Sequence, residues 1–160
     1  MRIGVPKEIK PQENRIGLTP DSVKTLVSEG HEVLVENNGG FEAGFDNDQY
    51  KNAGAKIIEK ATDIFNDAEI IVKVKEPQKV EVEMIKENQI VYTYLHLAAA
   101  KELTAGLVKS KSINIAYETI TDDNGRLPLL APMSAVAGRM SVQAGAHCLE
   151  KNQKGRGVLL

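Results

Sequence analysis

The sequence predicts an α/β fold in which a doubly wound, mostly parallel sheet is flanked by helices. Short apolar runs alternate with segments whose apolar residues recur at helical spacing, which is the rhythm of β/α units. Residues 70–74 are almost continuously apolar, which favours a strand buried on both faces by helices. The expected architecture is Rossmann-like or flavodoxin-like, without a dinucleotide-binding glycine fingerprint.

The strands of this sheet are predicted from apolar runs rich in isoleucine and valine. Each run is short and is followed by turn or helix signals, as expected for strands joined by crossover helices. The predicted strands span residues 2–5, 32–36, 55–58, 69–75, 89–95 and 113–117.

Helices are predicted between successive strands. The clearest one begins after Thr19, a typical N-cap residue that is followed by Pro20 at the first helical position. Gly30 is well suited to end this helix, because glycine readily adopts the left-handed conformation. Shorter helices are predicted at residues 46–53, at 62–66, after Pro77 and after His96.

The last part of the chain has a different pattern. Residues 122–125 (DDNG) carry the chemistry of a tight turn, and apolar residues at helical spacing from Ser134 to about Lys151 predict one long connecting helix. An apolar run then stops at residue 160, so we expect a piece of a longer protein. The predicted organisation is a substrate domain over 1–130, a helix over 131–152 and the start of a further domain over 153–160.

Composition and charge restrict the class of protein. Twenty basic and 22 acidic residues give a formal charge of -2 without a basic stripe, so no nucleic-acid partner is expected. No apolar run approaches the roughly 20 residues of a membrane span. The single cysteine, Cys148, is interpreted as a small buried helix residue, and with no export signal it favours a cytoplasmic setting. The histidines and the cysteine lack zinc-site spacing, so no metal site is expected.

Three residues near the ends of predicted strands are candidates for chemistry. Arg15 lies in the loop after the first strand, Lys75 ends the fourth strand and His96 follows the fifth. If these strands are parallel, their carboxyl ends share one sheet edge, where ligands bind in open α/β sheets. A guanidinium suits paired hydrogen bonds to a carboxylate, an ammonium adds a point charge, and an imidazole exchanges protons near neutral pH.

Purely structural roles are open for the same residues. Arg15 and Lys75 could be solvated surface cations, and the alternation of Lys73 with Lys75 would also suit an exposed edge strand. His96 could be a hydrogen-bonded structural histidine. The residues alone therefore define a candidate site without deciding its role.

Residues 2–8 (RIGVPKE) and 13–20 (ENRIGLTP) closely resemble the opening of alanine dehydrogenases, relatives of the nicotinamide nucleotide transhydrogenase α-subunit. The transhydrogenase branch generally lacks the histidine of residues 95–97 (LHL), so the alanine dehydrogenase branch is the better match. The chain is thus similar to the amino-terminal, substrate domain of that family. Further matching segments follow in order at residues 74–77, 94–98, 116–119 and 130–134.

This resemblance implies a reversible, NAD-dependent oxidative deamination of L-alanine to pyruvate and ammonia by a homo-oligomer. It implies that Arg15 and Lys75 bind the carboxylate and carbonyl region of the substrate and that His96 is the general acid/base. It also implies that Ser134 touches the dinucleotide, although this serine could simply cap its helix. The main NAD-binding domain would lie beyond residue 160, so the chain is expected to be inactive alone.

Two other functions stay open at this point. The same crevice could hold a small 2-oxo acid without chemistry, which would make the chain a non-catalytic binding module. A domain like the transhydrogenase α-subunit would instead have a membrane-associated partner and depend little on residue 96. A glycine-rich β-turn-α unit encoded after residue 160 would favour the enzyme over the binding module.

Overall fold

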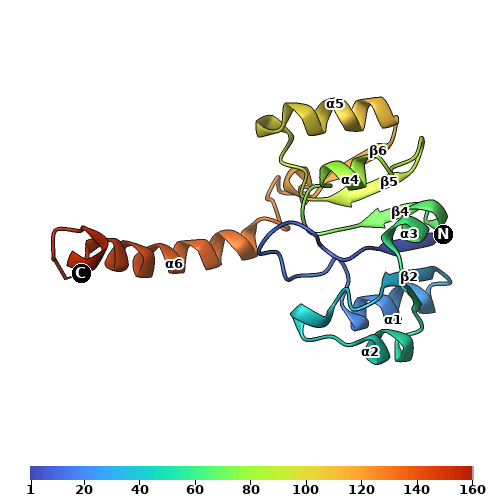
Figure 1. The fold of residues 1–160 in the computed structure, drawn as a ribbon, viewed down its shortest axis with the longest axis horizontal. Helices are drawn as coiled ribbons and strands as arrows, with labels where there is room; N and C mark the ends of the chain where they lie inside the picture. The colour runs from blue at the N-terminus through green and yellow to red at the C-terminus, as the bar shows by residue number, and fades with distance from the viewer. Residues whose placement is uncertain (160) are drawn as a thin grey trace. The chain divides into compact units, whose positions relative to one another are not determined.

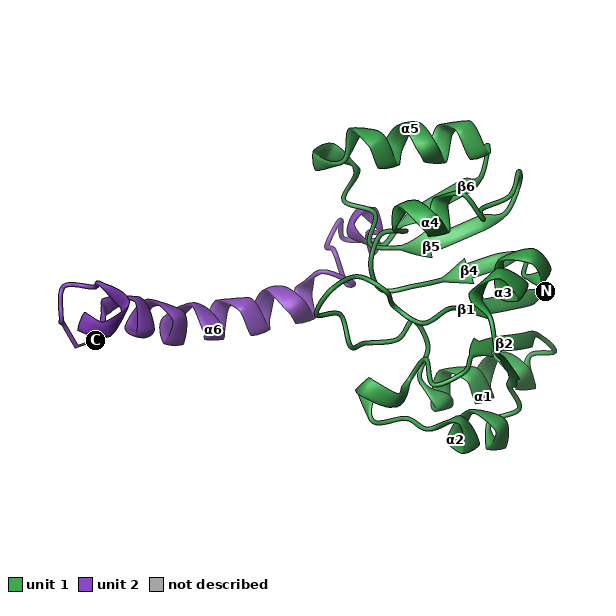
Figure 2. Cartoon of the chain, in the orientation of Figure 1, with its two compact units in different colours: residues 1–117 green, residues 118–160 purple. Residues whose placement is uncertain are grey.

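The computed structural model describes residues 1–159, which fall into two compact units (Figure 2). Unit 1 comprises Met1–Tyr117 and unit 2 comprises Glu118–Leu160. The candidate residues Arg15, Lys75 and His96 belong to unit 1, and Ser134 belongs to unit 2.

Unit 1 is built on a parallel sheet. Within residues 1–159, six strands pair in the order β3-β2-β1-β4-β5-β6, and each neighbouring pair is parallel (Figure 1). This order is that of Rossmann folds and confirms the predicted doubly wound sheet. The strands are β1 (Arg2–Val5), β2 (Glu32–Glu36), β3 (Lys56–Ile58), β4 (Ile70–Val72), β5 (Ile90–Thr93) and β6 (Ile113–Ala116).

The helices of unit 1 begin and end close to their predicted positions. The hydroxyl of Thr19 accepts a hydrogen bond from the Ser22 amide at 3.3 Å, so Thr19 caps α1 as its sequence predicts. Asp46 and Gln49 form a capping box at the start of α2. The helices are α1 (Pro20–Ser28), α2 (Asn47–Asn52), α3 (Ala61–Asp67), α4 (Lys79–Val82) and α5 (Lys101–Ser110).

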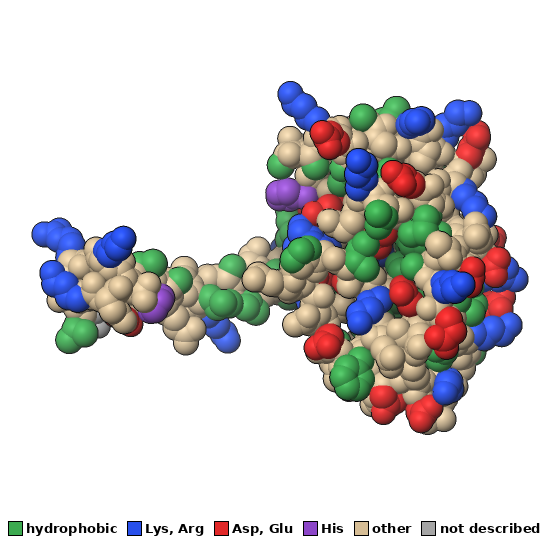
Figure 3. Space-filling view, viewed as in Figure 1, with side chains coloured by type: hydrophobic (Ala, Val, Ile, Leu, Met, Phe, Trp, Pro, Cys, Tyr) green, Lys and Arg blue, Asp and Glu red, His purple; other side chains and the backbone are tan. Residues whose placement is uncertain are grey.

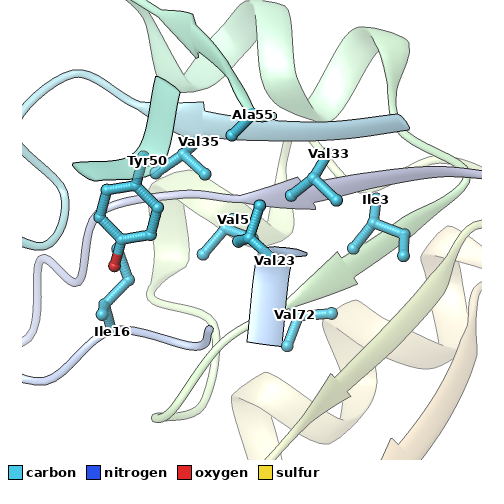
Figure 4. Packing of buried hydrophobic residues seen from close by; sticks show 9 residues of the cluster. All are labelled: Ile3, Val5, Ile16, Val23, Val33, Val35, Tyr50, Ala55 and Val72. Carbon is cyan, nitrogen blue, oxygen red and sulfur yellow. The ribbon is translucent and has the colours of Figure 1, made fainter. Parts of the chain in front are cut away.

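Both faces of the sheet carry a hydrophobic core. On one face, Val23 of α1 and Tyr50 of α2 pack against side chains of β1, β2 and β4 (Figure 4). On the other face, Phe65 of α3 and Leu107 of α5 pack against β2, β4 and β5. Burial on both faces explains why the strands read as continuous apolar runs. The sheet is therefore a rigid base for the residues that follow its strands.

Unit 2 contains the long helix α6 (Ala131–Leu149), for which the sequence predicted the range 131–152. The residue at its N-cap is Leu130, so the helix-capping alternative for Ser134 is wrong. The prediction that Cys148 is buried is also wrong, because this cysteine is exposed on a helix without buried residues. Helical spacing predicted the helix correctly, but burial also requires a packing partner within the unit.

Candidate active site

The topological switch point of the sheet lies between β1 and β4. The chain leaves β1 toward β2 on one side and leaves β4 toward β5 on the other, so the two connections diverge. Arg15 lies in the connection after β1 and Lys75 in the connection after β4. His96 follows β5, the neighbour of β4. The fold therefore brings these three residues to the carboxyl edge of three adjacent strands.

The segment that carries Lys75 is held by hydrogen bonds at both ends of that residue. The Lys75 amide donates to Oε1 of Glu8 at 3.2 Å, and the carbonyl of Lys75 accepts from the Thr93 hydroxyl at 2.9 Å. The Tyr94 amide donates to the Val74 carbonyl at 3.2 Å, which continues the contact between β4 and β5 beyond their ends. Lys75 is therefore fixed to the segment that leads to His96.

Arg15 is paired with Glu13 through two contacts between their side chains. Nε of Arg15 donates to Oε1 of Glu13 at 2.8 Å, and Nη2 donates to Oε2 at 2.6 Å. The Glu13 side chain is 8% exposed, whereas that of Arg15 is 48% exposed. These hydrogen bonds lower the pKa of the Glu13 carboxyl to about 2, and the positive charge of Lys75 contributes in the same direction. Arg15 therefore holds this carboxylate by direct contact, and Lys75 adds only a minor effect of its charge.

His96 has an unusual backbone conformation. Its φ of 52° and ψ of 38° place it in the left-handed region, which residues other than glycine rarely adopt. The exposed His96 precedes a short 3-10 helix, Leu97–Ala99, so the chain turns sharply where the imidazole is presented. Helix-ending residues such as Lys111 and Lys154 share this conformation, so it shapes the turn at His96 without by itself assigning a function to the residue.

Three tyrosines form an aromatic cluster beside this edge. The Tyr117 ring meets Tyr92 and Tyr94 edge-on, with ring centroids 4.3 and 4.8 Å apart. Such edge-to-face contacts are favourable and hold the rings in place. Burial raises the pKa of Tyr117, so its hydroxyl stays neutral. The cluster packs the ends of β5 and β6 together next to the segment that carries His96.

Sequence reasoning missed a buried ion network under the site. Nζ of Lys73 lies 3.1 Å from Oε2 of Glu8 and 2.7 Å from Oε1 of Glu81, and the Lys73 side chain is fully buried. The edge-strand alternative for Lys73 is therefore wrong, because β4 is a central strand and the lysine is paired inside the fold. A lysine within the apolar run 70–74 was the available signal.

Several other features concern ligands and surfaces. Among residues 1–159, no group of three or more His, Cys, Asp or Glu side chains is arranged to hold a metal ion. Within the same residues, every helix is too short or too polar to cross a membrane. On the face shown in Figure 3, acidic and basic side chains are interspersed over the surface of unit 1.

Comparison with known proteins places this geometry in a family. Residues 4–137 match the family model described as alanine dehydrogenase/PNT, N-terminal domain. The chain belongs to this family. It is 54% identical over 160 residues to the alanine dehydrogenase of Halomonas elongata and 51% identical to that of Methanococcus maripaludis. All of this chain is aligned, and it spans 43% of the length of each relative.

Solved structures show the same relationship. An L-alanine dehydrogenase superposes with a TM-score of 0.89 at 53% identity, over all of this chain and 44% of that one. The transhydrogenase of Sinorhizobium meliloti superposes with a TM-score of 0.70 at 26% identity, over 75% of this chain and 36% of that one. The alanine dehydrogenase is thus more similar in both fold and sequence, as the motif around His96 predicted.

Proposed function

We propose that this chain is the substrate domain of an NAD-dependent L-alanine dehydrogenase, which converts L-alanine, NAD and water into pyruvate, ammonia and NADH. The observation that carries the proposal is the carboxylate of Glu13, which Arg15 binds and which the charge of Lys75 also stabilises. A substrate carboxylate has the same charge and the same hydrogen-bonding geometry. The similarity to alanine dehydrogenases supports L-alanine and pyruvate as the molecules concerned.

Each residue has a distinct part in the proposed reaction. Arg15 binds the carboxylate of the substrate, and Lys75 places its charge beside the carboxylate and the carbonyl oxygen. Binding by these two cations orients the reacting carbon relative to His96. The His96 imidazole then exchanges a proton with the substrate as the general acid/base. The left-handed backbone at His96 supports a precise presentation of this ring.

Unit 1 itself does not fit NAD. In folds with this strand order, the pyrophosphate lies at a glycine-rich turn after the first strand. Residues 6–8 (PKE) follow β1 here, and the carboxylate of Glu8 accepts the amides of Val74 and Lys75 at the switch point. A pyrophosphate would be repelled by this buried carboxylate. We therefore propose that NAD binds outside unit 1, with Ser134 as one of its contacts.

A hybrid enzyme tests the catalytic part of the proposal. Residues 1–160 would replace the matching segment of the Halomonas elongata alanine dehydrogenase, and NADH formation from L-alanine would be followed. His96→Ala in this hybrid is expected to lower kcat about 10²- to 10⁴-fold, because a positioned acid/base contributes that much. His31→Ala is the matched control, since His31 lies directly before β2, at the opposite edge of the sheet. A near-normal rate for His96→Ala would overturn the assignment of the general acid/base to His96 and move that role to another residue.

The isolated chain tests whether it can react without further residues. Purified residues 1–160, mixed with NAD and L-alanine, are expected to form no NADH, because unit 1 has no fitting place for the dinucleotide. Turnover above the blank would contradict this part of the proposal. A hybrid that binds pyruvate but never turns it over would instead support a non-catalytic 2-oxo-acid-binding module.

The remaining parts of the proposal concern assembly and location. We propose a homo-oligomer, with the exposed apolar side chains Val136, Met140 and Val142 of α6 as candidate contacts between subunits. We also propose a cytoplasmic setting, which the free thiol of Cys148 supports. Light scattering of the hybrid, compared with its Val136→Asp and Met140→Asp variants, measures the contribution of α6 to assembly.

A further inference from the structure

The buried ion network consists of Lys73, Glu8 and Glu81, which come from three segments of unit 1. Their side chains are 0%, 2% and 3% exposed. Removing three charged groups from water carries a large desolvation penalty, which ion pairing alone does not reliably offset. Stability is therefore a weak explanation for this arrangement. The other hydrogen bonds of the Glu8 and Glu81 carboxylates indicate a second role for the buried ion network.

Both carboxylates bind backbone amides as well as Lys73. Oε1 of Glu8 accepts from the amides of Val74 and Lys75, at 2.7 and 3.2 Å. Oε2 of Glu81 accepts from the Gln78 amide at 2.7 Å, where the short helix α4 begins. The network thus ties the connection after β1, the end of β4 and the start of α4 together directly behind Lys75.

The backbone at Lys75 needs such support on the β1 side because the pairing of β4 with β1 has already ended. β4 is paired with β1 only at Ile70 and Ile71, whereas backbone hydrogen bonds to the β5 segment continue as far as Val74. Beyond Val72 the chain bends, and the carboxylate of Glu8 takes the place that a neighbouring strand would have as acceptor. An ionised oxygen holds two amides more strongly than a neutral one would.

We propose that Glu8 is a positioning residue for Lys75, and that Lys73 is retained to keep the Glu8 carboxylate in place. This inference rests on the proposed role of Lys75 in binding the substrate. Glu8 holds the amide of Lys75 while Thr93 holds its carbonyl, so the peptide groups on both sides of its Cα are fixed. The ammonium then starts from a fixed base, which reduces the ordering that substrate binding requires.

Two double variants of the hybrid enzyme separate positioning from charge balance. Glu8→Gln/Lys73→Met keeps an acceptor oxygen at residue 8, and Glu8→Met/Lys73→Met removes it with little change in shape. Both lack the ion pairs of Lys73, so they differ only in the ability to hold the amides of Val74 and Lys75. We expect the KM for pyruvate to be about tenfold higher in the Glu8→Met/Lys73→Met variant, with kcat values within about threefold.

Two reference variants make the result specific. Leu107→Ala opens a cavity in the core formed by α5 and lowers stability, and it is expected to leave the KM for pyruvate unchanged. Lys75→Ala is expected to raise that KM more than either double variant. If both double variants share one KM while Lys75→Ala raises it, the positioning role is wrong and the proposed function stands.

The other outcomes are equally decisive. If Lys75→Ala leaves the KM unchanged, or if the unmodified hybrid is inactive, the proposed substrate role fails and this inference fails with it. If Leu107→Ala raises the KM as much as the loss of the acceptor oxygen does, general destabilisation explains the effect and overturns positioning. Melting temperatures of all variants, measured alongside, show whether each protein is folded at the assay temperature.

Discussion

Charged side chains are handled differently at the two edges of the sheet. At the amino edge, Arg2 and Lys56 both contact the Glu32 carboxylate, at 2.9 and 2.6 Å, and each of these side chains is at least 34% exposed. At the carboxyl edge, Lys73 lies between two carboxylates with almost no exposure. Water screens the first group and leaves the second unscreened. Substitutions at the carboxyl edge should therefore have much larger effects.

A hollow at the amino edge does not coincide with the candidate residues. A hollow of about 480 Å³ lies at the amino edge, lined by Met1, Arg2, Gly30, Glu32, Asp67 and Glu69. Its charged groups are pairs in contact with solvent. His96 and the ion pair between Arg15 and Glu13 lie at the other edge.

The largest effect is expected for Lys73→Met in the 160-residue chain. This change leaves the carboxylates of Glu8 and Glu81 buried without their cation, which should lower the free energy of unfolding by about 3–5 kcal/mol. Urea unfolding followed by tyrosine fluorescence measures it for unit 1, because all four tyrosines lie there and the chain has no tryptophan. A loss below about 1 kcal/mol would mean that the network is solvated in solution.

A smaller effect is expected for Gly17→Ala, also at the carboxyl edge. A Cβ at Gly17 would lie 2.5 Å from the carbonyl oxygen of Val72, so the loop that carries Arg15 must move. We expect a loss of about 1–3 kcal/mol in unfolding free energy, together with a higher KM for pyruvate in the hybrid. The control is Gly30→Ala at the amino edge, where a Cβ meets no atom within 4 Å and only the φ of 82° opposes it. A rise in KM for both variants would remove the distinction between the edges.

Glu13 provides an intermediate case that can be measured by pH. Its pKa of about 2 lies below the usual 4.5, so the pair with Arg15 stabilises the fold above pH 4.5. This contribution is lost as the pH falls from 4.5 toward 2. Arg15→Gln removes the main cause, and the Glu13 midpoint should rise toward 4.5 in a carboxyl NMR titration. Lys75→Gln should raise it less, and equal shifts for the two variants would contradict the hydrogen-bonded pairing.

The carboxyl edge also shows how far sequence reasoning reaches. The placement of Arg15, Lys75 and His96 at the carboxyl edge was predictable, because the ends of parallel strands share one edge. Their closeness also depends on the adjacency of β1, β4 and β5, which the sequence does not reveal. The burial of Lys73 was not predictable. Its partners lie 65 and 8 positions away in the sequence, and an alternating pair of lysines has the same pattern on a central strand or an exposed one.

The end of β4 and the burial of Cys148 also depend on contacts that a local sequence pattern does not contain. β4 was expected over 69–75 but stops at Val72, because its pairing with β1 ends at Ile71 and the Glu8 carboxylate accepts the amides of Val74 and Lys75 instead. Cys148 was placed correctly in a helix and wrongly in a core, because periodicity describes one helix and burial depends on a second surface. Local pattern therefore predicted the elements, and contacts between distant residues decided burial and termination.

The smallest effect is expected for Lys56→Met, the same substitution made at the amino edge. Lys56 is 68% exposed and shares the Glu32 carboxylate with Arg2, which remains as a partner after the change. The melting temperature should therefore change by less than about 2 °C. This difference should become smaller in 0.5 M salt, because salt ions screen exposed charges. Lys73→Met should remain strongly destabilised in the same salt, since solvent ions do not reach its carboxylates. Equal salt dependence for the two variants would show that burial is not what separates the edges.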